Sequence, residues 1–476
     1  MRRGVAVGAG ALAAVMVAAG CSGSGGDREH DKGAGAGEKK PSLAKAATLS
    51  VPPGYRPAQG WDEQLPWVPG SVHSLPVHAT GKQVAVMHAV SNGYTVRVRD
   101  ASDGAVAWTS AAWQPPAPLE GAEGDASTGD RAEIPDLSTV TIGGADHFVA
   151  WAHGLDGKDE LHEGTEVVRL AVYPPDAKGR SVKPLREIDV PVSASPGEIR
   201  VDAVDGAEGR FLVGWGDEGL YPQSTAVVDA VTGKVTAHED PDSLLPQCEQ
   251  QIVCSGSRVM DLVAGDAPVV AMDGGGFGVP GSWFSKDVRP ADVPATFGVL
   301  SSANGILYGT SGDLLLAAWH PDPSSMQDPD PVWSVHELRT GKLLASVPCD
   351  ADLPSARNGD RDYVTTGSPS GRFLFAGPVV LDMERKKGLC LKSDGNPKTV
   401  LVNSADDRGT AYGVVEDTAG TETPTTVQLD LTTPAGTPEA LEPGTEVPFI
   451  SDLAGHGVFI TRDAGENLLV SLRRRT

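Results

Sequence analysis

Residues 100–108 read Asp-Ala-Ser-Asp-Gly-Ala-Val-Ala-Trp and follow the alternating run Val96-Arg97-Val98-Arg99. Together they predict a strand, a tight turn and a second strand. The chain repeats this pattern at Ala226–Lys234 and Ser334–Lys342, and more weakly near Asp382 and Asp430. In each strong copy an acidic residue lies four positions before a glycine. Its carboxylate can accept hydrogen bonds from the backbone of the turn, and glycine supplies the positive φ that a tight hairpin needs.

Short apolar runs recur between these hairpins, about 40 to 65 residues apart, a period typical of repeat architectures with one small sheet per unit. The runs are Val84 to Met87, Phe148 to Trp151, Phe211 to Trp215, Val269 to Met272, Leu314 to Trp319, Phe373 to Ala376, Tyr412 to Val415 and Val458 to Ile460. High glycine and proline contents favour many short strands over long helices. We expect an all-β propeller of seven or eight four-stranded blades, since the fourth run is poorly formed.

The strand–Asp-x-x-x-Gly-Lys–strand element resembles the repeats of quinoprotein-like (PQQ-repeat-like, WD40-like) β-propellers, and residues 100–108 match best, down to Trp108 after the turn. The resemblance covers most of residues 71–476, and a pair of β-sandwiches is the competing architecture. It also raises the hypothesis of a dehydrogenase using pyrroloquinoline quinone and calcium. That family commonly has adjacent cysteines and tryptophan motifs in most blades, which this chain lacks, so we expect no cofactor and no catalytic residues.

The N-terminus resembles a bacterial lipoprotein signal peptide. Arg2 and Arg3 precede an apolar stretch, and a run of small residues ends at Cys21, with Ala18 in place of the more usual leucine. The resemblance implies cleavage before Cys21 and its acylation, for example with palmitate. A plain secretory signal and a membrane-spanning anchor are the alternatives. The apolar stretch from Val5 to Ala19 has about 15 residues, whereas about 20 are needed to cross a bilayer. We expect a protein lipid-anchored to the cell membrane on its extracytoplasmic face.

Four segments follow from these patterns. Residues 1–20 are expected to be the signal peptide, and residues 21–46 a lipidated flexible tether, because they contain almost no apolar side chains. Residues 47–70 lead into the folded body. The propeller domain is expected over 71–476, and its last unit has room for about three strands, so residues before Ser71 would supply the fourth and close the ring.

Acidic residues dominate the charge. The formal net charge of −24 falls by two, to −26, when Arg2 and Arg3 leave with the signal peptide. Nucleic acid is excluded as a partner, because phosphate binding relies on clusters of lysine and arginine.

Four cysteines remain once Cys21 is set aside, and an even number outside the cytoplasm favours disulfides. Four cysteines allow three pairings. We favour Cys248–Cys254, which closes a small loop, and Cys349–Cys390, a longer staple. A metal site is the rival interpretation, but no Cys-x-x-Cys spacing supports it.

Residues with chemical potential are scattered. His88, His153 and His320 each lie near the end of an apolar run, where they either gather around the central channel or contact their own strands. Trp151, Trp215 and Trp319 occupy equivalent places and either line a ligand site or pack between blades.

Three further segments admit a functional or a structural interpretation. Residues 358–362 and 156–159 alternate oxygen ligands as calcium loops do, but acidic turns explain them equally well. Residues 276–281 satisfy a dinucleotide-binding pattern, which we reject because no helix can readily follow. The acidic, proline-rich segments 114–137 and 321–331 are expected to project from a rim as loops.

The function expected from these features is non-catalytic binding or scaffolding at the cell envelope, with a protein or envelope polymer as partner. It rests on analogy between folds. The alternatives are an envelope carbohydrate-active enzyme, a lyase or glycosidase with paired carboxylates in the channel, and a sensor for a membrane partner.

Overall fold

The computed structural model describes residues 46, 48–124, 131–204, 208–216, 224–238, 241–244, 257–263, 267–272, 275–291, 293, 305–319, 330–351, 366–392, 398–417, 425–433 and 438–476.

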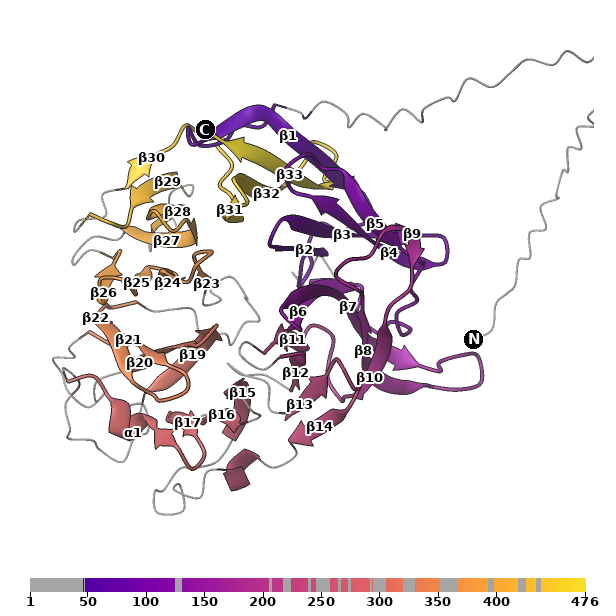
Figure 1. Ribbon diagram of the computed structural model, residues 1–476, viewed down its shortest axis with the longest axis horizontal. Helices are drawn as coiled ribbons and strands as arrows, with labels where there is room; N and C mark the ends of the chain where they lie inside the picture. Colours follow the sequence, from indigo (N-terminus) through magenta and orange to yellow (C-terminus); the bar gives the residue numbers. More distant parts are fainter. Residues whose placement is uncertain are drawn as a thin grey trace, which may run out of the picture. The chain divides into compact units, whose positions relative to one another are not determined.

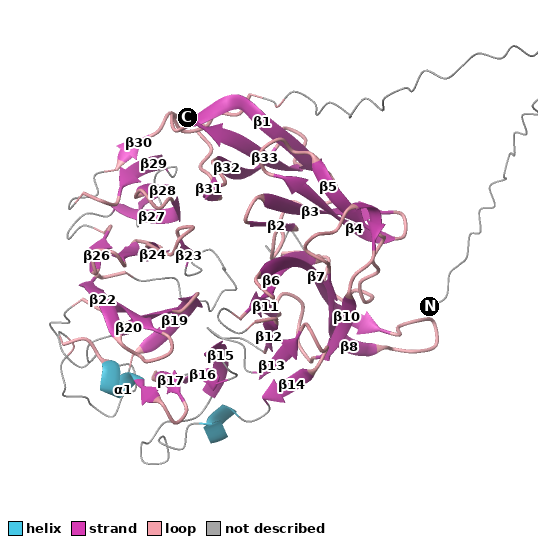
Figure 2. Cartoon of the chain, in the orientation of Figure 1, coloured by secondary structure: helices cyan, strands magenta, loops and turns pink. Residues whose placement is uncertain are grey.

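Eight sheets, antiparallel except for one added strand in blade 1, are arranged around a common axis and form an eight-bladed β-propeller (Figure 1). The expected all-β fold is confirmed, and the number of blades is eight. The fourth blade, which the sequence defines poorly, has its four strands like the others. Helix in the described ranges is confined to α1 (Ser285–Val288) and the 3₁₀ turn η1 (Pro241–Leu244) (Figure 2), and neither is long enough to cross a bilayer.

The strands of each blade follow one another from the central axis outward. Blade 1 contains β2 (Val77–Thr80), β3 (Gln83–Val90), β4 (Gly93–Asp100), β5 (Val106–Ser110) and an added strand β9 (Gly179–Val182). Blade 2 contains β6 (Asp136–Ile142), β7 (Ala145–Asp156), β8 (Thr165–Val172) and β10 (Arg186–Pro191). Blade 3 contains β11 (Arg200–Ala203), β12 (Arg210–Trp215), β13 (Ser224–Asp229) and β14 (Val235–His238). Blade 4 contains β15 (Ser257–Val263), β16 (Ala267–Met272), β17 (Phe277–Val279) and β18 (Trp283–Phe284).

The second half of the ring has the same order. Blade 5 contains β19 (Ile306–Ser311), β20 (Leu314–Trp319), β21 (Val332–Glu337) and β22 (Leu343–Pro348). Blade 6 contains β23 (Thr366–Gly367), β24 (Phe373–Ala376), β25 (Val379–Asp382) and β26 (Lys387–Cys390). Blade 7 contains β27 (Lys398–Ala405), β28 (Thr410–Asp417), β29 (Thr425–Asp430) and β30 (Glu439–Ala440). Blade 8 contains β31 (Ile450–Leu453), β32 (His456–Arg462), β33 (Leu468–Arg475) and β1 (Tyr55–Leu65).

The repeated turn between the third and fourth strands has the geometry that its sequence predicts. The Gly104 N–H donates to the Asp100 carbonyl at 2.9 Å, and the Asp100 side chain accepts the Ser102 N–H at 2.8 Å. The turn at Gly233 repeats the backbone bond, with the Asp229 carbonyl as acceptor at 2.7 Å. Both glycines have positive φ, 68° and 80°, where a side chain is disfavoured. The acidic residue therefore fixes the turn that joins these strands.

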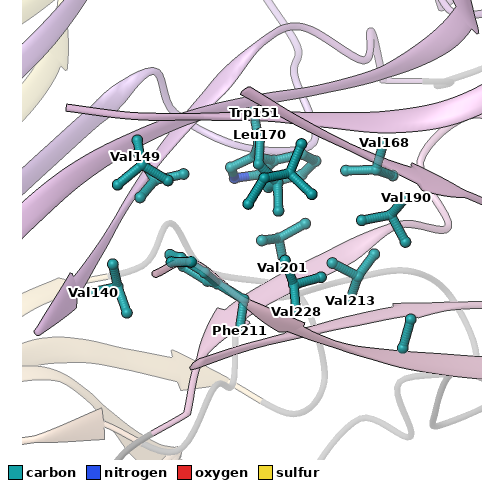
Figure 3. Packing of buried hydrophobic residues seen from close by; sticks show 14 of the residues in the cluster. Val140, Val149, Trp151, Val168, Leu170, Val190, Val201, Phe211, Val213 and Val228 are labelled. Atoms are coloured by element: carbon teal, nitrogen blue, oxygen red, sulfur yellow. The ribbon is translucent and has the colours of Figure 1, made fainter. Parts of the chain in front are cut away.

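Blades pack face to face through apolar side chains. Figure 3 shows one such interface, where Trp151 and Leu170 of blade 2 lie over Val201 and Val213 of blade 3. Phe211 fills the gap beside them and is fully buried. Alternating residues along each strand point to opposite faces of a sheet, so each blade contacts both neighbours and the core continues from blade to blade.

The ring is closed by the N-terminal strand. β1 pairs antiparallel with β33, so blade 8 takes three strands from the end of the chain and its fourth from before Ser71. Arg473 is fully buried in this join, where its guanidinium lies 2.7 Å from the Asp62 carboxylate and donates to the Pro57 carbonyl at 2.9 Å. The two ends of the folded chain are thus held together by a buried charge pair as well as by the strand ladder.

Two features join neighbouring blades at the outer edge. β9 comes from the connection between β8 and β10 of blade 2, and it pairs parallel with β5 of blade 1. It covers the outer edge of blade 1, which would otherwise expose unpaired backbone groups. The Cys349–Cys390 disulfide, with Cα atoms 5.3 Å apart, links the end of β22 in blade 5 to β26 in blade 6.

Candidate functional site

The inner strands of four consecutive blades enclose a pocket of about 460 Å³, which we call the four-blade pocket. Blades 6, 7, 8 and 1 form it at the carboxyl ends of β23, β27, β31 and β2, which lie on the inner side of the ring (Figure 1). The lining residues are Ala79, Thr80, Gly81, Thr366, Gly367, Pro369, Phe375, Ser404, Ala405, Phe449, Ile450, Ser451, Asp452, Leu453 and Ala454. Its volume is typical of small-ligand sites.

Two hydroxyl groups in the lining already donate their hydrogens to the protein. Thr80 Oγ1 donates to the Asp146 carboxylate at 2.5 Å, which joins blade 1 to blade 2. Ser404 Oγ donates to the Pro448 carbonyl at 2.7 Å. A hydroxyl has one hydrogen and two lone pairs, so both oxygens can still accept a hydrogen bond but can no longer donate one.

Asp452 is the charged residue of the lining, and β33 holds it in place. Its carboxylate accepts from Arg475 Nη1 at 2.8 Å and from the Gly455 N–H at 2.9 Å. Arg475 also bonds the buried Asp406 carboxylate. Burial would raise the pKa of Asp406, but the hydrogen bond from Arg475 and others outweigh it, so this pKa lies below its ordinary value. Asp406 is therefore ionised at neutral pH.

The rim of the pocket is aromatic and exposed. Phe449 has 53% of its surface exposed, which is unusual for a phenylalanine, and it precedes β31 directly. Phe375 lies in the same lining but is buried, with 2% exposed. On the blade 8 side, the Tyr55 hydroxyl of β1 donates to the Ser451 carbonyl at 2.6 Å. The lining thus contains an exposed apolar side chain, Phe449, and a backbone segment at Ser451 that is held by a hydrogen bond from β1.

Two of the three candidate histidines, His88 and His153, contact carboxylates of other segments. His88 Nε2 lies 2.9 Å from the Glu63 carboxylate on β1. The fully buried side chain of His153 lies between two carboxylates, with Nδ1 3.2 Å from Glu133 and Nε2 2.9 Å from Glu166. Burial would lower the pKa of His153, but the two carboxylates outweigh it and raise the pKa. Both residues serve packing between segments; His320 lies outside the described residues.

The candidate tryptophans pack between blades. Trp151 and Trp319 are 4% and 1% exposed, and Trp215 packs against the same cluster as Trp151. Trp108, after the first turn, is also buried and has its ring centroid 5.5 Å from that of Tyr173 in blade 2. The packing interpretation is therefore the right one.

The acidic segment 156–159 is a structural turn. Asp159 Oδ1 accepts the Leu161 N–H at 2.7 Å and the His162 N–H at 2.8 Å, while Asp156 pairs with Arg169. In the part of the chain that the structure describes, no three His, Cys, Asp or Glu side chains could hold a metal ion. Residues 358–362, Cys21, Cys248 and Cys254 lie outside that part.

Two other sequence patterns prove structural. The glycine pattern at 276–281 forms β17 and the turn into β18, so the rejection of a phosphate site is supported. The expectation that 114–137 projects from a rim is wrong for its described residues. Ala117 and Leu155 exchange backbone hydrogen bonds of 3.0 and 2.7 Å, which fasten this segment along β7. Residues 321–329 are not described.

Sequence reasoning missed the four-blade pocket. Its segments lie up to 375 positions apart, between Ala79 and Ala454, and no motif marks any of them. The one local signal is Phe449, an aromatic residue preceded by Pro448 at the start of a strand, and this signal is too common to identify a site.

No family model matches this chain, and neither does any curated protein. Among solved structures, the WD40 domain of coronin from Toxoplasma gondii is similar at 10% identity and a TM-score of 0.34, covering 90% of this chain and 88% of that one. The β-propeller domain of the Trilobed protease from Pyrococcus furiosus is similar at 11% identity and a TM-score of 0.34, covering 84% and 93%. Likenesses this distant carry no argument about function. The chain has an eight-bladed β-propeller fold, as its strand pairing shows.

Proposed function

We propose that the protein is a non-catalytic binding module, lipid-anchored through Cys21 on the extracytoplasmic face of the cell membrane, and that the four-blade pocket is its ligand site. The pocket is the observation that carries the proposal. It is formed by the ends of four inner strands, and its hydroxyl and carboxylate groups are fixed by hydrogen bonds to neighbouring strands. A site built on rigid strands loses little conformational entropy when a ligand binds.

The pocket favours binding over carbohydrate hydrolysis. Glycoside hydrolysis normally uses two carboxylates about 5–10 Å apart, one of them with a proton to give. Asp452 is the single carboxylate among the described residues that line the pocket. Its two oxygens accept hydrogen bonds from Arg475 and Gly455.

The ligand site is tested by filling it. Thr366 is exposed and lies in the lining, so Thr366→Trp places an indole at the mouth of the pocket. Leu161→Trp is the matched control, because Leu161 is 88% exposed in the β7–β8 loop, outside the lining. Both are made in the full chain carrying Cys21→Ala. After exposure to an envelope extract, native mass spectrometry should find compounds on the parent and on Leu161→Trp that Thr366→Trp has lost. Compounds retained by Thr366→Trp would place the binding elsewhere.

The anchor has a separate test. Fractionation of cells should find the parent chain with the membrane in high salt and the Cys21→Ala chain released, with both folded by circular dichroism. A Cys21→Ala chain that stays with the membrane would contradict the lipid anchor.

A further inference from the structure

Two of the four hydroxyl groups in the lining, those of Thr80 and Ser404, can accept hydrogen bonds but have none left to give, whereas the buried Ser451 Oγ has no partner among the described residues and keeps its hydrogen. The hydrogens of Thr80 and Ser404 are committed to Asp146 and to the Pro448 carbonyl, and the Asp452 carboxylate only accepts. Each oxygen keeps an unused lone pair. A ligand that satisfies these groups must therefore bring N–H or O–H donors of its own.

The charged side chain among the described lining residues is negative. No lysine, arginine or histidine is among the described lining residues, while Asp452 is, with 36% of its side chain exposed. Arg475 lies behind Asp452 and is only 11% exposed, so it holds the carboxylate without presenting its own charge to a ligand. Asp146 accepts the hydrogen bond from the Thr80 hydroxyl, and Asp407 accepts one from Ser368, which precedes Pro369 in the chain. Among the described residues that line the pocket, an anion would meet the Asp452 carboxylate and no cationic side chain other than Arg475 behind it.

The rim suits the apolar part of a cation. Phe449 is half-exposed and lies in the lining, and a cation within about 6 Å of an aromatic centroid is stabilised by roughly 0.5–1 kcal/mol at exposed sites. Ile450 and Phe375 extend the apolar wall inward. Apolar surface for a hydrocarbon body and acceptors for an ammonium group thus line the same pocket.

We propose that the four-blade pocket binds a small organic amine, with an apolar body against Phe449 and an ammonium group that donates to Asp452 and to the Thr80 and Ser404 oxygens. This ligand class rests on the proposed function, since it names what the same site holds. With Asp452 in the lining, we expect carboxylates and phosphates to bind more weakly than amines.

Three probes that share a phenyl body test the proposal: 2-phenylethylamine, 2-phenylethanol and 3-phenylpropionate. Each is titrated by calorimetry at pH 7 into the full chain carrying Cys21→Ala. We expect the amine to bind at least tenfold more tightly than the alcohol, and the carboxylate to bind least. Equal affinity for amine and alcohol, tighter binding of the carboxylate, or failure of all three to bind would overturn the proposal.

Two variants locate the charge recognition. Asp452→Asn keeps an acceptor for the Gly455 N–H, and it should lower the affinity for the amine about tenfold while leaving the alcohol unchanged. Asp189→Asn is the matched control, because Asp189 is 41% exposed, pairs with one arginine and lies outside the lining. Phe449→Leu, at an exposed position, should weaken binding of the amine severalfold more than binding of the alcohol. If Asp452→Asn binds the amine like the parent, the assigned site is wrong.

The two proposals can fail separately. If Thr366→Trp loses bound compounds but the parent shows no preference for the amine, the pocket remains a ligand site and its ligand is of another chemical class. Compounds retained by Thr366→Trp would remove the pocket from the function, whatever the amine does.

Discussion

Glu63→Gln should destabilise the propeller by an amount that depends on pH. Glu63, on β1, is 6% exposed and carries the ion pairs that join blade 8 to blade 1. Arg97 Nη1 lies 2.6 Å from its carboxylate, and Arg99 Nε lies 2.5 Å from it. Burial would raise the pKa of Glu63, but its contacts with His88 and Arg99 outweigh that effect and lower the pKa to about 2.

The magnitude follows from linkage. The ordinary pKa of the group is 4.5. A pKa lowered to about 2 in the folded protein corresponds to about 3 kcal/mol of stability at pH 7, at about 1.4 kcal/mol per unit. Because the folded-state pKa is the lower one, this stability is fully present above pH 4.5 and is lost as the pH falls toward 2. Glutamine cannot ionise, so the difference between parent and variant should shrink to about 2 kcal/mol at pH 3.5.

Urea denaturation followed by tryptophan fluorescence, at several pH values between 7 and 3.5, measures this difference in the Cys21→Ala chain. Glu187→Gln is the matched control, since Glu187 is exposed on β10 of blade 2 and should change the free energy of unfolding by less than about 0.5 kcal/mol, as surface substitutions usually do. A Glu63→Gln effect that is small at pH 7, or that stays constant as the pH falls, would refute the linkage argument.

Two further predictions concern other parts of the ring. The disulfide between Cys349 and Cys390 closes a loop with a sequence separation of 41, so the double variant Cys349→Ser, Cys390→Ser should lose about 4 kcal/mol of unfolding free energy by the chain-entropy model. Urea denaturation with and without reductant measures this loss, and a parent that reductant does not destabilise would contradict it. His336 is fully buried, accepts from Ser334 at 2.8 Å, and has its pKa lowered to about 4, chiefly by burial. The neutral His336 ring therefore contributes fully to stability above pH 6.5, and this contribution is lost as the pH falls toward 4. Nitrogen chemical shifts should show a neutral ring at pH 5, and a ring already protonated at that pH would contradict the lowered pKa.

The repeating unit was predictable because its causes are local. Asp100 and Gly104 act within one turn, and the alternation of Val96 and Val98 with arginines sets which side chains enter the blade interface. Turn formation and strand alternation depend on the spacing of residues along the chain, which can be read from the sequence. The doubt about the fourth blade had a local cause too, since β17 and β18 are only three and two residues long and show little periodicity.

The pocket was not predictable, because its causes are not local. Its walls come from strand ends that meet only after the ring has closed, and small residues such as Gly81 and Ala405 leave no pattern. The same limit hid Glu63, whose arginine partners lie 34 and 36 residues away on another blade. A buried carboxylate looks like any surface glutamate until its partners are known.

Ring closure and the proposed ligand site share one set of contacts, and this makes them thermodynamically linked. Tyr55 of β1 bonds the Ser451 carbonyl in the pocket wall, and Arg475 of β33, the strand that β1 pairs with, holds Asp452. A ligand that needs this wall binds only the closed ring, so it stabilises the docking of β1 by RT ln(1 + [L]/Kd), about 2.7 kcal/mol at a hundredfold excess over Kd. By the same linkage, weakening the closure at Glu63 lowers the apparent affinity for such a ligand only as far as it lowers the fraction of closed rings, although Glu63 is not in the pocket lining.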